Sequence, residues 1–266
     1  MNKALVTWAA GKEFFESPYF WSYIGSLKNT SATDIFVFTH DMPDYVREKL
    51  SNFTIIDYPK DQIHYLIRDR NLAFTNWIKL VQNDYDVFLF TDSKDVIFQS
   101  DPFEYWNPSY EIMVTCEGMK HGDSLWNLAD QSVTQMNCKE FQYSAEQHPV
   151  INGGIVMGKG ICLKYHFFLI WSFSLKSSPA TDQGSLNYLY KWLSNGPYYH
   201  HTDPRTDCFC LTGEAVKHNL VQTKFENGVY KNMEDKTYCI VHQWDRLNNT
   251  NEIIERYSDT HATLRF

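Results

Sequence analysis

The sequence lacks the features that mark membrane-spanning, secreted and nucleic-acid-binding proteins. No stretch approaches the roughly 18 apolar residues that a membrane-spanning helix needs, and residues 1–10 lack the long apolar core of a signal peptide. Lys and Arg total 24 against 32 Asp and Glu, and the net charge of -8 argues against general nucleic-acid binding. The sequence therefore predicts a cytoplasmic protein with no membrane span and no nucleic-acid partner.

Two further absences exclude zinc-binding and redox classes. No Cys-x-x-Cys pair occurs among the six cysteines, which predicts reduced thiols rather than a zinc site. The Gly-x-Gly-x-x-Gly fingerprint of a nicotinamide-dependent dehydrogenase does not follow the first apolar run. There is also no internal repeat, low-complexity stretch or evident linker. The six cysteines are Cys116, Cys138, Cys162, Cys208, Cys210 and Cys239.

Apolar side chains are abundant enough for one sizeable core. Of the 266 residues, 43% are hydrophobic and 16% are aromatic, which suits one large α/β domain or two small ones. Most aromatic residues are expected in the core. A few are expected to line a cleft, where aromatic faces could pack on the apolar faces of sugar rings.

Apolar runs alternate with helical patterns through the first hundred residues. Strands are predicted at 4–8, 34–39, 53–57 and 86–91, and helices at 18–28, 43–50 and 62–82. This alternation predicts an α/β fold with a doubly wound, mostly parallel central sheet flanked by helices. The run at 86–91 is nearly all apolar, as expected of a strand covered on both faces. Ligands of such sheets bind beyond the carboxyl ends of the strands.

The second half of the chain is more mixed and predicts a smaller region beside the sheet. Strands are predicted at 111–115, 151–157 and 239–242, and helices at 161–175 and 182–193. The intervening segments 117–149 and 196–236 are predicted to be loops that face the substrates.

Two carboxylates follow the strand at 86–91, namely Asp92 and Asp95. Hard oxygen ligands at this edge of a sheet suit Mn²⁺ or Mg²⁺. Such an ion would bridge the two phosphates of a nucleoside diphosphate and stabilise the charge that grows on the leaving group. Alternatively, Asp92 caps the following turn and Asp95 pairs with Lys94.

Three later features support a ligand site. Asn152, Gly153 and Gly154 interrupt an apolar strand, which marks either close approach of a ligand or another backbone, or a bulge or tight crossing of the strand. Asp182 begins a predicted helix, where it either interacts with the helix dipole or binds acceptor hydroxyls and acts as a base. His242 ends a late apolar run and is followed by Trp, Asp and Arg, although a lone His is more often structural.

Taken together, these residues resemble the GT-A glycosyltransferases. The similarity is greatest to members whose metal-binding segment reads Thr-Asp-x-x-Asp-Val-x-Phe-Gln-x-Asp-Pro-Phe, which here runs from Thr91 to Phe103. The Asn-Gly-Gly strand, the Asp182-Gln183 pair and the segment 242–246 follow in the expected order. The resemblance implies a single GT-A domain over 1–266, with a nucleotide-binding half at 1–110 and an acceptor-binding half at 111–266.

The resemblance also implies the metal ligands. Asp95 would bind the metal directly, His242 would complete its coordination, and Asp92 would touch the ribose or join the metal shell. The spacing departs from the usual Asp-x-Asp, because two residues separate the carboxylates. Ser93 could therefore occupy the place of the first Asp.

The remaining positions are carried over as contacts to the donor or the acceptor. Arg70 would reach the donor or brace Asp92, unless it is simply a surface residue. The other implied contacts are Thr7 and Trp8 beside the base, Asn152, Gly153 and Gly154 beside the donor sugar, and Asp182 with Gln183 facing the sugar or the acceptor.

The predicted activity is transfer of a hexosyl or pentosyl group from a UDP- or GDP-sugar to a hydroxyl of a glycan or small-molecule acceptor, with Mn²⁺ or Mg²⁺ as cofactor. Asp182 is the candidate base of an inverting enzyme, whereas a retaining enzyme would need none. One alternative is a sugar-nucleotide nucleotidyltransferase, although the segment 9–12 is a poor version of its Gly-rich loop. The other is a non-catalytic carbohydrate-binding protein.

Overall fold

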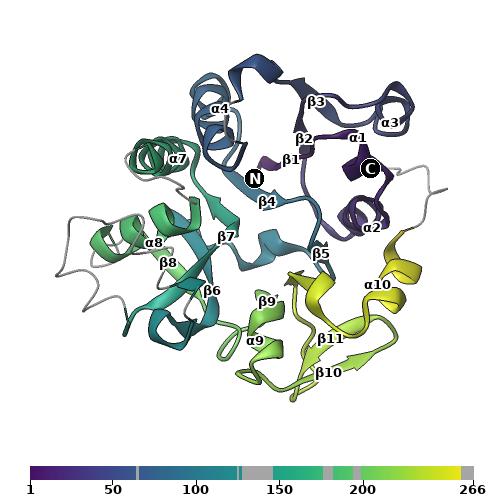
Figure 1. Ribbon diagram of the computed structural model, residues 1–266, viewed down its shortest axis with the longest axis vertical. Coiled ribbons are helices and arrows are strands. Elements are labelled where there is room, and N and C mark those ends of the chain that lie inside the picture. Colours follow the sequence, from purple (N-terminus) through teal and green to yellow (C-terminus); the bar gives the residue numbers. More distant parts are fainter. Residues whose placement is uncertain (64–65, 125, 128–145, 176–181, 194–198, 259–266) are drawn as a thin grey trace.

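The computed structural model describes residues 1–63, 66–124, 126–127, 146–175, 182–193 and 199–258. Its centre is a seven-stranded sheet with the order β3-β2-β1-β4-β7-β6-β8 (Figure 1). Only β7 runs antiparallel to its neighbours, and every other pairing is parallel. The predicted mostly parallel sheet is therefore confirmed. Its strands are β1 (Lys3–Trp8), β2 (Asp34–Thr39), β3 (Thr54–Asp57), β4 (Val87–Asp92), β6 (Ile112–Lys120), β7 (Pro149–Gly158) and β8 (Tyr199–Thr202).

Helices cover both faces of this sheet. Successive residues of a strand point to opposite faces, and in β1 Leu5 packs in one apolar cluster whereas Val6 packs in another. The first cluster includes Tyr23 of helix α2, and the second includes Phe74 of α4 and Phe167 of α7. The helices are α1 (Lys12–Glu16), α2 (Pro18–Ser26), α3 (Asp44–Lys49), α4 (Leu66–Val81), α7 (Gly160–Ser174) and α8 (Asp182–Leu193).

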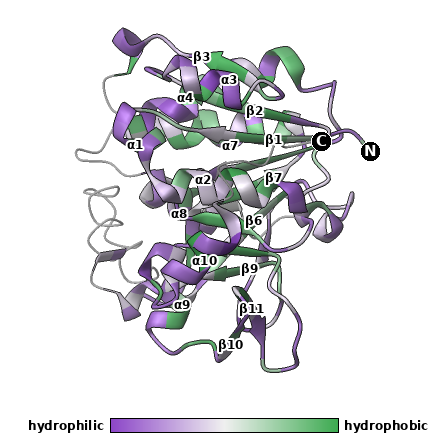
Figure 2. Cartoon of the chain, turned by 90° about the vertical axis from the view of Figure 1, so that its right-hand side faces the viewer, coloured by the Kyte–Doolittle hydropathy of each residue, from purple (hydrophilic) through white to green (hydrophobic). Residues whose placement is uncertain are grey.

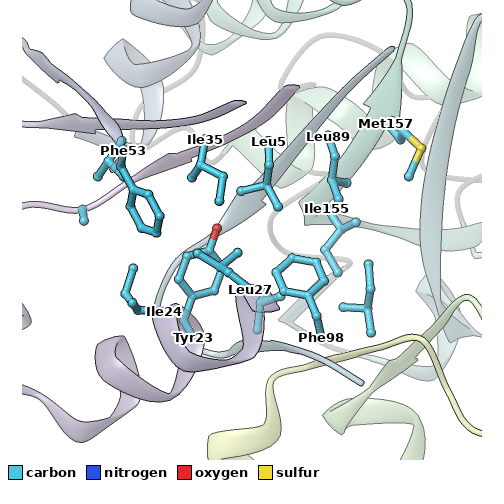
Figure 3. Packing of buried hydrophobic residues seen from close by; sticks show 14 of the residues in the cluster. Leu5, Tyr23, Ile24, Leu27, Ile35, Phe53, Leu89, Phe98, Ile155 and Met157 are labelled. Atoms are coloured by element: carbon cyan, nitrogen blue, oxygen red, sulfur yellow. The ribbon is translucent and has the colours of Figure 1, made fainter. Parts of the chain in front are cut away.

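The two clusters explain why the strands are apolar throughout. Figure 3 shows the first cluster, in which side chains of the sheet meet those of α2 and the turn after it. In Figure 2 the strands of the central sheet are accordingly among the most hydrophobic parts of the chain. This arrangement confirms the predicted doubly wound fold. The labelled residues of Figure 3 include Leu5, Ile35, Leu89, Tyr23, Ile24 and Leu27.

A smaller mixed region completes the fold. Strand β12 (Ile240–His242) lies between β5 (Val96–Phe98), to which it is antiparallel, and β9 (Cys210–Thr212), to which it is parallel. A third apolar cluster around Trp244 joins this sheet to the remaining elements. These are α9 (Gly213–Lys217), the hairpin of β10 (Thr223–Glu226) and β11 (Val229–Asn232), and α10 (Thr250–Tyr257). Short 3-10 turns lie at Leu27–Asn29, Lys60–Gln62, Pro102–Tyr105, His121–Asp123 and Trp244–Arg246.

The two predicted substrate loops contain more regular structure than their sequence indicates. Strand β6 continues to Lys120, although polar residues interrupt its apolar run after Cys116. Residues 125 and 128–145 of the first loop lie outside the described residues, as do residues 196–198 of the second. The rest of 196–236 forms β8, β9, α9, β10 and β11. These elements have three to five residues, too few for a hydrophobic period to be recognised.

The described residues bear on the predicted state of the cysteines and on the predicted absence of a membrane span. Cys116, Cys162, Cys208, Cys210 and Cys239 are free thiols, and Cys138 lies outside the described part. Within the described ranges, none of the helices is sufficiently long and apolar to cross a membrane.

Candidate active site

Three side chains with metal-ligand chemistry meet at one end of the sheet. Asp92 ends β4, Asp95 lies in the turn before β5, and His242 ends β12. One ligand atom from each lies within 4.8 Å of the others. The Nε2 atom of His242 is 3.5 Å from Oδ2 of Asp95 and 3.9 Å from Oδ2 of Asp92.

Strand pairing is what brings His242 to the two carboxylates. The antiparallel register of β5 and β12 places His242 opposite Val96, the residue after Asp95. The backbone N–H of Gln243 also donates to the carbonyl of Asp95 at 2.7 Å. Gln243 adopts a left-handed conformation with φ 59°, which is uncommon for a residue with a side chain.

The electrostatics of the cluster suit a cation. Burial alone would lower the pKa of His242, but Asp95, Asp92 and Glu117 outweigh burial and raise it. Burial alone would raise the pKa of Asp95, but His242 outweighs it and lowers that pKa. The imidazole therefore lies in a region of negative potential. Two carboxylate oxygens and one imidazole nitrogen form a donor set that fits a divalent ion such as Mn²⁺ or Mg²⁺.

Gly154 provides the space that this cluster occupies. In the register of β4 and β7, Thr91 lies opposite Ile155, so that Gly154 lies beside Asp92. A Cβ atom on Gly154 would be 2.4 Å from Cε1 and 2.6 Å from Nε2 of His242, and 2.8 Å from Oδ2 of Asp92. The close approach predicted for the Asn-Gly-Gly segment is therefore present at Gly154.

Arg70 joins Asp92 to Asp182. Its Nη1 lies 2.7 Å from Oδ1 of Asp92, and its Nη2 lies 2.5 Å from Oδ2 of Asp182. Burial alone would lower the pKa of Arg70, but Asp182 and Asp92 raise it, so Arg70 remains cationic. Arg70 thus holds the first residue of α8 against the end of β4 and contacts Asp92 there, whereas its contact with a donor stays a prediction.

Several of the predicted donor contacts line one narrow cavity between the sheet and helices α4, α7 and α8. The cavity has a volume of about 30 Å³, and its inner wall is formed by apolar residues such as Phe90 and Val156 together with His166. The indole of Trp8 is stacked on Phe38 beside it. The predicted site residues that line this cavity are Trp8, Arg70, Asp92, Gly153, Gly154 and Asp182.

A buried carboxylate that the sequence analysis missed connects two further predicted residues. Glu117 accepts hydrogen bonds from Nδ2 of Asn152 at 3.0 Å and from Nε2 of Gln183 at 3.3 Å. The Oδ1 atom of Asn152 in turn accepts from the N–H of Gly154 at 2.8 Å. A signal was available, because Glu117 is the one acidic residue directly after the mostly apolar stretch at 112–116.

Thr7 and Ser93 lie in the interior and connect strands. The hydroxyl of Thr7 donates to the carbonyl of Thr91 at 2.9 Å, and that of Ser93 donates to the carbonyl of Trp8 at 2.6 Å. Both side chains are buried. Contact of Thr7 with a nucleotide base, and of Ser93 with a donor or metal, therefore stays a prediction.

Replacing Arg70 with lysine is expected to lower the free energy of unfolding by about 2 kcal/mol, because one ammonium cannot reproduce the two-pronged contact with Asp92 and Asp182. Urea denaturation would measure the change. Arg47→Lys is a matched control, since the Arg47–Asp57 pair is largely exposed and should contribute less than about 1 kcal/mol. An equal effect of the two substitutions would contradict the structural role assigned to Arg70.

His166 gives the stability of the protein a predicted pH dependence. Burial lowers the pKa of His166 to about 3. In the unfolded chain His166 therefore takes up a proton near the usual histidine pKa, whereas in the folded chain it stays neutral. This preferential protonation of the unfolded chain lowers the free energy of unfolding as the pH falls. We expect the free energy of unfolding of the wild type, relative to that of His166→Gln, to fall by about 2 kcal/mol between about pH 7.5 and about pH 5. A difference that is constant with pH would contradict this assignment.

Comparison with known proteins adds a family and a fold. A family model described as nucleotide-diphospho-sugar transferase matches residues 74–250, a segment that contains Asp92, Asp95, Gly154, Asp182 and His242. Among solved structures, an active-site mutant of LgtC matches with a TM-score of 0.55 over 90% of this chain and 86% of that chain. Their sequence identity is 13%, so this likeness concerns the fold. A search of curated proteins finds no match.

Proposed function

The chain belongs to the nucleotide-diphospho-sugar transferase family and is a glycosyltransferase, and from this premise we propose that it transfers a sugar from a UDP- or GDP-sugar to a hydroxyl of a glycan or other acceptor, using Mn²⁺ or Mg²⁺. One observation carries the proposal. In a family that handles nucleotide-diphospho-sugars, ligand atoms of Asp92, Asp95 and His242 lie within 4.8 Å of one another at the end of the sheet.

Asp92, Asp95 and His242 would hold the metal. When bound, a divalent ion would offset the negative charge of the diphosphate leaving group. The protein contributes a preformed set of ligands, since Arg70 orients Asp92 and the backbone of Gln243 holds the turn that carries Asp95. An imidazole ligand suits Mn²⁺ better than Mg²⁺, so Mn²⁺ is the expected preference.

The donor sugar would lie between the metal ligands and the start of α8. Gly153 presents no side chain there, and the paired side chains of Arg70 and Asp182 line the same cavity, where Oδ1 of Asp182 would accept from a sugar hydroxyl. Asn152 and Gln183, which share Glu117, would fix the neighbouring backbone and face the sugar or the acceptor. Trp8 at the end of β1 would lie beside the nucleotide base, and Thr7 would lie behind Trp8.

In the transfer, the bond between the anomeric carbon and the diphosphate oxygen breaks, and the acceptor oxygen forms a new bond to that carbon. The acceptor hydroxyl loses its proton. Burial raises the pKa of Asp182, with Arg70 opposing the rise, and a raised carboxylate pKa suits a general base. However, Oδ2 of Asp182 is paired with Arg70. Oδ1 would therefore take the proton if the enzyme inverts the anomeric configuration, and a retaining course would leave Asp182 only a binding role.

A thermal-shift panel tests the proposal. UDP, GDP, CMP and common nucleotide-sugars would each be added with Mn²⁺, with Mg²⁺ and with EDTA. A ligand near 100 times its dissociation constant adds about 2.7 kcal/mol, which corresponds to a rise in Tm of roughly 5–10 °C for a chain of this size. The expected rise occurs with UDP or GDP compounds and disappears in EDTA. The absence of a shift with any nucleotide at millimolar concentration would contradict the proposal.

A further inference from the structure

A second cleft, with a volume of about 470 Å³, lies on the smaller mixed region, which also carries His242 at the end of β12. It is bounded by α9, the β10–β11 hairpin and the chain just after the 3-10 turn Trp244–Arg246. Figure 1 shows α9, β10 and β11 grouped together below β5 and β9. The cleft falls within the range of about 300–1,000 Å³ that is typical of ligand sites.

The elements that line this cleft also support His242. Arg246, on the rim of the cleft, follows His242 by one short 3-10 turn. Gly213, the first residue of α9, packs so tightly on Gln243 that a Cβ atom there would lie 2.2 Å from its carbonyl oxygen. Helix α9, which lines the cleft, therefore packs on the residue that follows His242, although the cleft contains none of the residues assigned to the candidate metal site.

The groups that line the cleft suit an uncharged, hydroxyl-rich ligand. Asn248, Asn249 and Thr223 present amide and hydroxyl groups, and Phe225 is a half-buried aromatic ring that packs on Tyr230 with ring centroids 4.6 Å apart. The exposed side-chain amides of Asn219 and Asn248 make no hydrogen bond with the part of the chain that the structure describes. Ligand sites typically combine an apolar surface with a few such polar groups.

The charges around the cleft argue against an anionic ligand. Its two cations, Arg246 and Lys217, both contact Glu214, at 2.6 Å and 3.9 Å. Glu214 is also 3.2 Å from Nε2 of His218. Because Glu214 contacts both cations and the side chain of Asn249 bonds to Tyr230, the groups that remain for a ligand are the amides of Asn219 and Asn248, the hydroxyl of Thr223 and the ring of Phe225. None of the described residues that line the cleft is acidic.

We propose that this cleft binds the acceptor as an oligosaccharide, holding sugar units beyond the one that receives the transferred residue. A sugar ring has an apolar face for Phe225 and hydroxyls for the amides of Asn219 and Asn248. With its reacting hydroxyl at the metal site, the acceptor chain would extend past Arg246 into the cleft. This inference rests on the proposed function and names the substrate class of its acceptor.

A glycan array probed with the whole protein tests the inference. The array would carry oligosaccharides beside their component monosaccharides, and the cleft variant would be Asn219→Gly with Asn248→Ala. Glycine replaces Asn219 because that residue has φ 54°. The matched control is Asn76→Ala with Asn83→Ala, which removes two exposed amides at the far side of the molecule on and just after α4.

The wild type and the control are expected to bind one family of oligosaccharides, and the cleft variant is expected to bind it about tenfold or more weakly. Metal-dependent hydrolysis of UDP- and GDP-sugars without acceptor, measured in parallel, should be the same in all three proteins. No oligosaccharide binding by the wild type, or equal binding by the cleft variant, would overturn the inference. Absence of donor hydrolysis in all three would instead contradict the proposed function, so the two failures are distinguishable.

Discussion

Replacing Asp95 with alanine is expected to lower the metal-dependent transfer rate by about a thousandfold, because it removes one of the three proposed metal ligands and the carboxylate nearest to His242. Asp95 is the carboxylate closer to His242, at 3.5 Å between Oδ2 and Nε2. The rate of nucleotide release from UDP- and GDP-sugars with Mn²⁺ would measure the effect. The rise in Tm with nucleotide and Mn²⁺ should be lost in the same variant.

Asp86→Ala is the matched control for this substitution. Asp86 precedes β4, its side chain is 62% exposed, and it pairs with the N-terminus at the opposite end of the strand. Its removal should leave both the rate and the metal-dependent shift in Tm unchanged. An Asp95→Ala enzyme that keeps more than about a tenth of the wild-type rate would contradict the assignment of Asp95 as a metal ligand.

Replacing Gly154 with alanine is expected to lower the transfer rate about a hundredfold and the free energy of unfolding by about 1–3 kcal/mol, because the methyl group overpacks the site. It would meet His242 and Asp92 at 2.4–2.8 Å, well inside van der Waals contact. Gly154 lies in an irregular stretch of β7, because Val156 and Asn152 pair with the successive residues Val114 and Thr115 of β6, while Ile155 next to Gly154 pairs with Thr91 of β4. Steady-state kinetics and urea denaturation would measure the two effects.

The neighbouring glycine supplies a control on the same strand. A Cβ atom on Gly153 would meet only Gln183 at 3.8 Å and Asp182 at 3.9 Å, which is ordinary contact. Gly153→Ala should therefore keep its stability and its Mn²⁺ dependence, and a change confined to the donor KM would agree with a sugar lying against it. Equal losses of stability in the two variants would show that the strand, rather than the metal cluster, is sensitive to the added methyl group.

The sequence by itself determined the architecture of the central sheet and the position of the two carboxylates of the candidate metal site. Strands β1, β2 and β4 could be predicted because the residues at 4–8, 34–39 and 87–91 are mostly apolar, with Thr or Asp as the exceptions, and such runs are buried on both faces. Parallel strands present their ligand groups at the carboxyl end. Because Asp92 and Asp95 come at the end of β4 or just after it in the sequence, both carboxylates could be predicted to lie at the carboxyl edge of the sheet.

Only the tertiary structure decided which distant residues meet these carboxylates. His242 reaches Asp95 through the antiparallel register of β5 and β12, and Arg70 contacts Asp182 across 112 residues of chain. Glu117 joins Asn152 and Gln183 from three separate elements. Likewise, the small elements around the acceptor cleft are too short for a local hydrophobic period. Local patterns report the burial and period of single elements, whereas contacts between elements depend on strand register and helix packing, and no local pattern carries that information.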